Sequence, residues 1–260
     1  MKTRTAAVAG YFYDAAAGRL QHDVTRLLNA ENAAPGVFPE ALIVPHAGYV
    51  YSGSTAASAY RQLLVDPGQV KRVLLLGPAH RVYVRGMAIP SVEAFATPLG
   101  EIALDRDGIE RVAGLPAVQV SDEAHRDEHS LEVQLPFLQT VLDDFTLIPV
   151  VIGGADATQV AAVVDELASE EGLLVVVSSD LSHFLDYDEA RRIDADTCDR
   201  ILHKDTTLKG EQACGATAIN GLMASDWCRA LQVSLIAACN SGDTAGTRDR
   251  VVGYAAFSLH

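Results

Sequence analysis

Short, almost wholly apolar runs alternate along the chain with longer segments in which apolar residues recur every three or four positions. The apolar runs predict strands buried on both faces, and the recurring pattern predicts amphipathic helices. The predicted strands are Ala41–Val44, Arg72–Leu76, Thr146–Ile152, Leu173–Ser178, Ser234–Ala238 and Val251–Phe257. The predicted helices are Ser54–Leu64, Leu131–Leu142, Ala157–Ala168, Asp188–Leu202 and Ala216–Ala230. This alternation is typical of a mostly parallel sheet with helices on both faces.

A further pair of strands is expected in EAFATPLGEIALD, where Pro98-Leu99-Gly100 predicts a hairpin turn. The hairpin would be an antiparallel addition, so the sheet is predicted to be mixed. Pro136 lies close enough to the start of its predicted helix to kink that helix without ending it. With 260 residues and no internal repeat or low-complexity tract, the chain is expected to form a single α/β domain, residues 1–260.

Composition narrows the classes of partner. A formal net charge of -14 argues against nucleic acid, because binding a phosphate backbone requires clustered lysine and arginine. The cysteines Cys198, Cys214, Cys228 and Cys239 form no CxxC pair, which is expected of free thiols in a reducing compartment. No run approaches the ~20 apolar residues that span a bilayer, and the N-terminal segment lacks a secretory core. A soluble, cytoplasmic protein with no membrane contact is therefore expected.

Four of the predicted strands end close to residues that can bind metal or move protons. LIVPHAGY ends near His46 and VLLLGPAH ends at His80. LLVVVSSDLSH carries Asp180 and His183, and SLIAACNSGD ends at Asp243. Because open α/β sheets bind ligands beyond the carboxyl ends of their strands, these side chains are expected to share one crevice.

His46 and His80 stand in equivalent settings and are the predicted metal ligands. Histidine pairs suit iron, zinc, copper and nickel, so the third ligand decides the chemistry. Asp243, Asp180 and, more remotely, Cys239 are the candidates. A carboxylate would complete the set found in non-haem Fe(II) oxygenases, whereas a closed tetrahedral set would indicate structural zinc. The alternative for Asp243 is an ordinary turn, which NSGD also favours.

Two polar pairs are candidates for proton transfer. His183 is the best candidate for a general acid or base, and Asp180 would orient or charge it; the alternative is that SSD only caps a helix. Glu128 and His129, in AHRDEHSLEVQLP, lie at the start of a helix. There a carboxylate is also favourable simply as a partner of the helix dipole.

Tyr49 and Tyr51, in GYVYSG, are candidate substrate-pocket residues that would hydrogen-bond a phenolic or carboxylate ligand; the alternative is amphipathic packing. The chain has no Walker A loop, no GxGxxG after a strand and no GxSxG elbow. Nucleotide hydrolysis, hydride transfer and α/β-hydrolase chemistry therefore lack their usual signals.

Eight motifs, in order, resemble the Memo family, whose bacterial members are called AmmeMemoRadiSam system protein B. They are PHAGYVYSG, LLGPAH, TPLGEI, DEHSLEVQLPFLQ, SSDLSHF, CGATAI, NSGDT and VVGYAAF. The resemblance covers nearly the whole chain and implies a fold related to the class III extradiol dioxygenases of the LigB type. It implies metal-binding histidines at His46 and His80, and an acid or base at His183 beside Asp180. The family's glutamate and histidine motif corresponds to Glu128 and His129.

In some eukaryotic members of that family the third ligand is a cysteine in the segment that matches NSGDT. Thr244 stands at that place here, beside Asp243. A thiolate would favour a soft metal, while an aspartate would restore the dioxygenase-like set, so Fe(II) is expected, with Cu or Zn as alternatives. The family name also implies AMMECR1-like and radical-SAM proteins as partners.

The leading hypothesis is a metal-dependent oxidoreductase that acts on an unknown small-molecule substrate. Iron or copper would be held by His46, His80 and a carboxylate, and His183 would move protons. One alternative is a non-catalytic module that binds a metal or a peptide and recruits partner proteins. Another is a metal-assisted hydrolase, in which zinc activates water.

Overall fold

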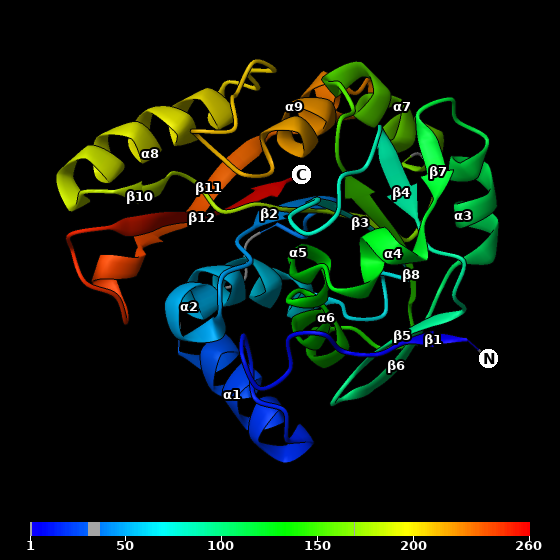
Figure 1. Cartoon of the computed structure of the whole chain (residues 1–260), viewed down its shortest axis with the longest axis horizontal. Helices are drawn as coiled ribbons and strands as arrows, with labels where there is room; N and C mark the ends of the chain where they lie inside the picture. The colour runs from blue at the N-terminus through cyan, green and yellow to red at the C-terminus, as the bar shows by residue number, and fades with distance from the viewer. Residues whose placement is uncertain (1, 31–36, 169) are drawn as a thin grey trace.

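A mixed sheet runs through the centre of the molecule, with helices on both faces (Figure 1). The structure is a computed structural model that describes residues 2–30, 37–168 and 170–260. The strands of the large sheet are β2 (Ala41–Val44), β3 (Arg72–Pro78), β4 (Met87–Ile89), β7 (Val118–Val120), β8 (Thr146–Ile152), β9 (Leu173–Ser178), β10 (His183–Leu185), β11 (Val233–Asn240) and β12 (Val251–Leu259). Their order is β10-β12-β2-β9-β3-β8-β4-β7, and β11 also pairs with β12.

The four central strands, β2, β9, β3 and β8, are parallel to one another. Arg72 of β3 lies opposite Thr146 of β8 and Leu173 of β9, so these strands begin at the same level. The outer strands β12 and β4 run antiparallel to the central set. The predicted mixed sheet is therefore confirmed, with its parallel part at the centre, where both faces are buried.

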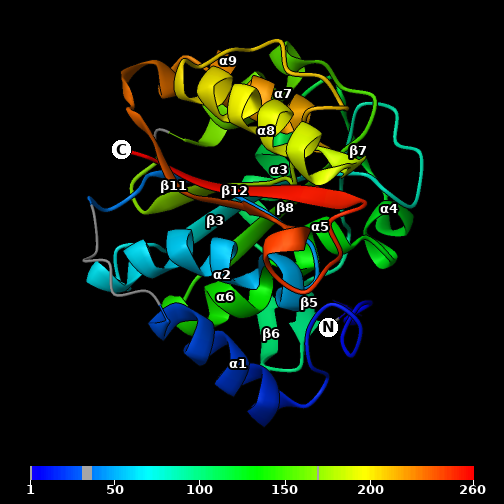
Figure 2. The same cartoon turned by 90° about the vertical axis from the view of Figure 1, so that its left-hand side faces the viewer.

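Helices form a layer on each side of this sheet. They are α1 (Ala17–Asn29), α2 (Tyr49–Tyr60), α3 (Arg106–Ala113), α4 (Asp122–Arg126), α5 (His129–Glu132), α6 (Leu135–Val141), α7 (Ala157–Leu167), α8 (Tyr187–Leu202) and α9 (Ala216–Ala224). Short 3-10 helices are η1 (Arg61–Val65), η2 (Trp227–Ala230) and η3 (Ser241–Asp243). Figure 2 shows the sheet edge-on, with α7, α8 and α9 on one face and α1, α2 and α6 on the other.

The helix predicted over Leu131–Leu142 is two short helices, α5 and α6. Pro136 lies in the first turn of α6, where no intrahelical partner is needed for its missing N–H. The predicted kink is thus a break just before the proline. It lets α5 approach the end of β3 while α6 packs against α1 and α2.

The hairpin around Pro98–Gly100 is confirmed as β5 (Ala94–Thr97) and β6 (Gly100–Ala103). It joins β1 (Thr3–Arg4) in a separate three-stranded sheet, so its predicted place in the large sheet is wrong. β4 pairs with β8 only at Val151 and Ile152, and the hairpin contributes to the large sheet no more than an isolated bridge between Leu104 and Leu147, because its strands pair with each other and with β1.

The apolar residues of both faces form one buried cluster. Close packing of α7 against α9 depends on Gly221, because a Cβ atom at that position would lie 2.3 Å from Cβ of Val160. No helix in the described part of the chain is long and apolar enough to cross a membrane.

Candidate metal centre

Three histidine side chains meet beyond the carboxyl ends of the central strands. His46 lies just after β2, His80 lies just after β3, and His129 is the first residue of α5. One ring nitrogen from each histidine lies within 4.8 Å of the others. β2 and β3 lie on either side of β9 and are parallel to it, so their carboxyl ends share one edge of the sheet. The structure thus brings His46 and His80 together and adds His129, which was predicted only as a candidate for proton transfer.

Glu128 holds two of these histidines. Its carboxylate accepts hydrogen bonds from the backbone N–H of His80 at 2.6 Å, from Nδ1 of His80 at 3.0 Å, and from the backbone N–H groups of His129 at 3.0 Å and Ser130 at 2.9 Å. Burial raises the pKa of Glu128, but these hydrogen bonds outweigh it and hold the pKa at about 2. Glu128 is therefore ionised at neutral pH, and Nδ1 of His80 is the protonated nitrogen.

The tautomer of His46 follows from the hydrogen bonds of Ser178. The Ser178 hydroxyl donates its one hydrogen to the carbonyl oxygen of Ser130 at 2.6 Å and accepts from Nε2 of Gln134 at 2.8 Å. Its contact with Nδ1 of His46, at 2.9 Å, must then be a hydrogen bond that His46 donates. Both His46 and His80 are left with a lone pair on Nε2, which is the form that binds metal.

Burial also favours the neutral form of two of these histidines, His46 and His129. It lowers the pKa of His46 well below its ordinary value, and the neighbouring His80 and His129 add to this effect. Burial lowers the pKa of His129 to about 4. Nδ1 of His129 is buried and makes no hydrogen bond within the described residues, and Oε1 of Glu128 lies 3.4 Å away. Clustered imidazoles, one of them without a hydrogen bond at its buried Nδ1, fit a bound metal cation.

Asp180 lies just beyond the end of β9 and supports the histidine loop. It accepts a hydrogen bond from the backbone N–H of His46 at 2.7 Å, and its side chain is buried. Burial raises the pKa of Asp180 to about 7. The carboxyl group can therefore gain or lose a proton near neutral pH, which is compatible with the predicted role in proton transfer.

His183 begins β10 and faces the same space. Its Nδ1 is 2.8 Å from the carbonyl oxygen of Leu181, which can only accept, so Nδ1 is protonated and Nε2 keeps its lone pair. Burial lowers the pKa of His183, which favours the neutral form. A cavity of about 460 Å³ is lined by His46, His80, His129, Asp180 and His183, together with other residues. The base predicted at His183 thus shares a cavity with the three-histidine cluster.

Cys214 also lies at this site, although no sequence pattern assigns it a role. Its Sγ lies 3.3 Å from Nε2 of His46 and accepts from the backbone N–H of Asp180 at 3.3 Å. Burial raises the pKa of the Cys214 thiol to about 12, so the thiol is protonated in the absence of a metal. The signal was the CGATAI motif, which places this cysteine immediately before α9.

Asp243, the predicted third ligand, is not brought to the cluster. It is the last residue of η3, and its carboxylate accepts from the Tyr187 hydroxyl at 2.5 Å and from the backbone N–H of Asn240 at 3.1 Å. It lines a different cavity, together with Cys198 and Cys239. The local structure of NSGD agrees with the alternative interpretation as a turn: Asn240 and Asp243 form a capping box around the short helix η3.

The two tyrosines of GYVYSG separate. The hydroxyl of Tyr49 donates to the carbonyl oxygen of Val133 at 2.9 Å, and its ring packs against Phe137 at 4.9 Å. Tyr51 lines the histidine cavity. Only Tyr51 is therefore placed to contact a molecule in that cavity.

The fold and the site define a mixed α/β protein with a candidate three-histidine metal site at the carboxyl ends of parallel strands. The family model described as Memo-like protein matches residues 4–258, and the chain belongs to this family.

Its relatives include a MEMO1 family protein of Aquifex aeolicus, which is 33% identical over 98% of both chains. Another, from Archaeoglobus fulgidus, is 37% identical over 83% of this chain and 84% of its own. Among solved structures, the uncharacterized protein JW3007 from Escherichia coli K12 superposes with a TM-score of 0.55, covering 84% of this chain and 98% of that chain. At 13% identity this likeness concerns the fold alone.

Proposed function

We propose that the protein is a metal-dependent oxidoreductase whose Fe(II), or alternatively Cu, is held by His46 and His80 and completed by His129 or Cys214. The observation that carries the proposal is the cluster of three imidazoles with ring nitrogens within 4.8 Å of one another, which opens into a cavity that holds a fourth imidazole, His183. Imidazole ligands with open positions suit redox-active iron and copper, whereas structural zinc sites are closed.

The third ligand determines which metal the site prefers. His129 offers an imidazole whose buried Nδ1 makes no hydrogen bond in the described structure, and an imidazole suits iron. Cys214 offers a sulfur 3.3 Å from Nε2 of His46, which suits a softer ion such as Cu(I). Metal binding would release the thiol proton, because the thiolate is the ligand.

Two groups of this chain would move protons. Nε2 of His183 carries a lone pair, so it can take a proton from a substrate hydroxyl in the cavity. Asp180 is buried beside the cluster, and its pKa of about 7 allows it to hold that proton at neutral pH. A metal ion bound by the histidines would supply Lewis acidity and an electron-transfer centre for oxygen-dependent chemistry.

Metal content tests the first half of the proposal. The wild-type chain, His46→Ala, His129→Ala and Cys214→Ser would be purified without oxygen, and bound metals counted by mass spectrometry. His203→Ala is the matched control, because His203 is exposed at the end of α8. We expect one iron or copper per wild-type chain, its loss in His46→Ala, and no change in the control. A loss in only one of His129→Ala and Cys214→Ser would identify the third ligand; equal metal in all variants would refute the site.

Turnover tests the second half. Iron-loaded wild type and His183→Gln would be compared by oxygen consumption with a panel of catechol-like compounds. We expect oxygen uptake by the wild type and its loss in His183→Gln at unchanged iron content. Full metal loading without oxygen uptake by either protein would instead favour a non-catalytic binding module or a hydrolase.

A further inference from the structure

The cavity lined by His46, His80, His129 and His183, called the histidine cavity here, has a positively charged residue at its mouth although the chain as a whole is acidic. The sequence holds 34 acidic and 20 basic residues, yet Arg250 is the one arginine or lysine among the described residues that line this cavity. Arg250 is exposed and makes no ion pair with a described carboxylate. An unpaired guanidinium at the mouth of a cavity retains its capacity to bind a carboxylate or phosphate.

Arg250 is held beside an aromatic side chain. Its guanidinium carbon lies 4.9 Å from the ring centroid of Phe184, and the ring of Phe184 lies 5.7 Å from that of His183. Phe184 is 60% exposed, although it lines the same cavity. At the mouth of the cavity, the apolar ring of Phe184 therefore lies against the positive charge of Arg250.

The backbone of Phe184 is strained. Its φ angle is +61°, in the left-handed region that is unfavourable for a non-glycine residue. This unfavourable backbone conformation is not offset by burial of the ring, because the Phe184 side chain remains exposed to solvent. Strain that persists at an exposed aromatic residue next to His183 indicates a role for the ring in contacting a ligand.

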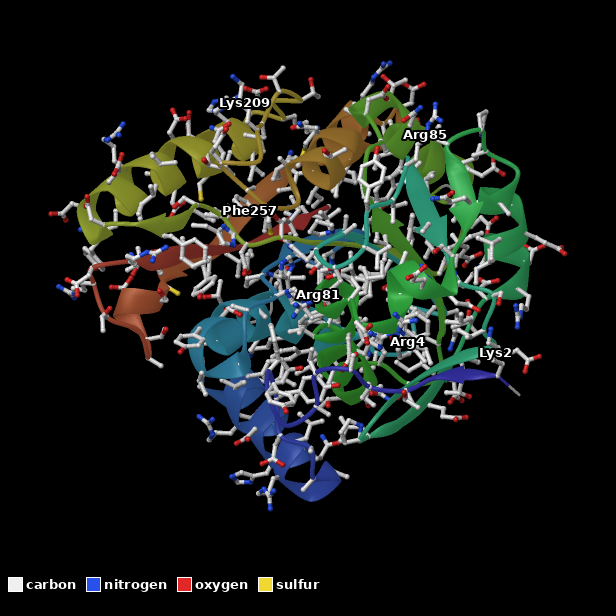
Figure 3. The ribbon with its side chains drawn as sticks, in the orientation of Figure 1. Lys2, Arg4, Arg81, Arg85, Lys209 and Phe257 are labelled. Atoms are coloured by element: carbon white, nitrogen blue, oxygen red, sulfur yellow. The ribbon has the colours of Figure 1, made fainter. Side chains whose placement is uncertain are left out.

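A second arginine acts on the cluster from another side. Arg81 follows His80 and lines an adjacent cavity of about 430 Å³ that also contains Cys214. Its positive charge is one of the causes that lower the pKa of His129, after burial, so it lies within electrostatic reach of the cluster. Figure 3 shows Arg81 near the centre of the view, whereas Arg85 lies toward the outer side of the molecule.

We infer that the substrate of this site is an aromatic acid, with its ring against Phe184 and its anionic group on Arg250. The inference rests on the proposed function in that the metal would act on the same molecule. The aromatic residues Phe12, Tyr51 and Tyr254 complete the cavity walls and suit a flat ring. Arg81 adds positive potential that draws an anion toward the cluster.

The test uses benzoate, acetate and benzyl alcohol as probes, titrated calorimetrically into metal-free and iron-loaded protein. We expect benzoate to bind more tightly than either probe that lacks the ring or the charge. Arg250→Gln should weaken benzoate about tenfold, the value of one charge-assisted hydrogen bond, and leave benzyl alcohol unchanged. Arg81→Gln should weaken benzoate less, and Phe184→Leu should weaken both ring-bearing probes.

Two matched control variants distinguish an effect of the arginine at the cavity mouth from a general effect of removing a positive charge. Arg248 also stacks on an aromatic ring, that of Tyr187 at 4.3 Å, but does not line the histidine cavity. Arg85 shares a loop with Arg81 and lines neither cavity. Glutamine at either control position should leave benzoate binding unchanged.

Equal affinity for benzoate and benzyl alcohol, no binding of any probe, or equal losses in Arg250→Gln and Arg248→Gln would overturn the inference. Because the metal-free titration does not depend on iron, these results leave the metal site standing. A protein that binds benzoate through Arg250 but takes up no iron would refute the proposed function alone.

Discussion

Replacing Glu128 with glutamine should weaken metal binding far more than it destabilises the fold. The Glu128 carboxylate accepts hydrogen bonds from both His80 and His129, and it is ionised because its pKa is about 2. Glutamine keeps one oxygen acceptor but presents an amide donor in place of the second oxygen. The negative charge that fixes Nδ1 of His80 as the protonated nitrogen is lost.

The magnitude follows from those contacts. One carboxylate oxygen accepts from Nδ1 of His80 and from the N–H groups of His129 and Ser130, while the other accepts only the N–H of His80. If the glutamine oxygen keeps the hydrogen bonds from Nδ1 of His80 and from the N–H groups of His129 and Ser130, the backbone N–H of His80 loses its acceptor. A buried donor without an acceptor lowers the unfolding free energy by about 1–3 kcal/mol. Loss of a carboxylate that orients a histidine ligand typically weakens metal binding about 10–100-fold.

Two measurements check this prediction. Chelator competition gives the metal affinity, and urea unfolding of the metal-free protein gives the stability. Glu123→Gln is the control, because Glu123 is exposed on α4. The pH dependence gives a second readout: with a folded pKa of about 2 against 4.5 unfolded, Glu128 contributes about 3 kcal/mol above pH 4.5, and this is lost as pH falls toward 2. Wild-type metal affinity in Glu128→Gln would contradict a role for Glu128 in orienting the metal-binding histidines.

Three further substitutions test the supports of the site. Burial lowers the pKa of His125 to about 4, so between pH 6.5 and 4 this histidine takes up a proton only in the unfolded chain, which destabilises the fold. When the unfolding free energy is measured as the pH is lowered, His125→Gln should therefore lose about 3 kcal/mol less than the wild type. Gly253→Ala would place a Cβ atom 2.0 Å from Oδ2 of Asp194 and should cost about 1–3 kcal/mol in urea unfolding, whereas Gly18→Ala, with open space, should not destabilise. Glu132→Gln removes the charge facing the buried Arg4 guanidinium at 2.6 Å and should lower thermal stability by about 3–5 kcal/mol; a change under 1 kcal/mol would contradict this assignment.

The positions of His46 and His80 at the strand ends could be predicted because short-range sequence patterns identify the parallel strands. His46 and His80 each follow an apolar run, and adjacent parallel strands place their carboxyl ends at one edge of the sheet. The hairpin was also predictable, but its partner was not. Its docking on β1 is a contact between Thr3–Arg4 and Ala94–Phe95, and no short-range pattern records such a distant pairing. Arg4, labelled in Figure 3, then donates a hydrogen bond to the carbonyl oxygen of His125 in α4.

The remaining residues of the site depend on segments whose path the sequence pattern does not specify. His129 reaches the cluster because a helix ends after Glu132 and a new one begins before Pro136, a break that apolar periodicity hides. Cys214 reaches it on the connection between α8 and α9, which has no periodicity at all. Strand ends therefore supply one pair of imidazoles, while irregular segments supply His129 and Cys214, the two groups proposed as the third ligand. Under the proposed function, a single change in either segment would therefore be expected to alter the metal preference without disturbing the sheet, as function generally resides in connections that a rigid core positions.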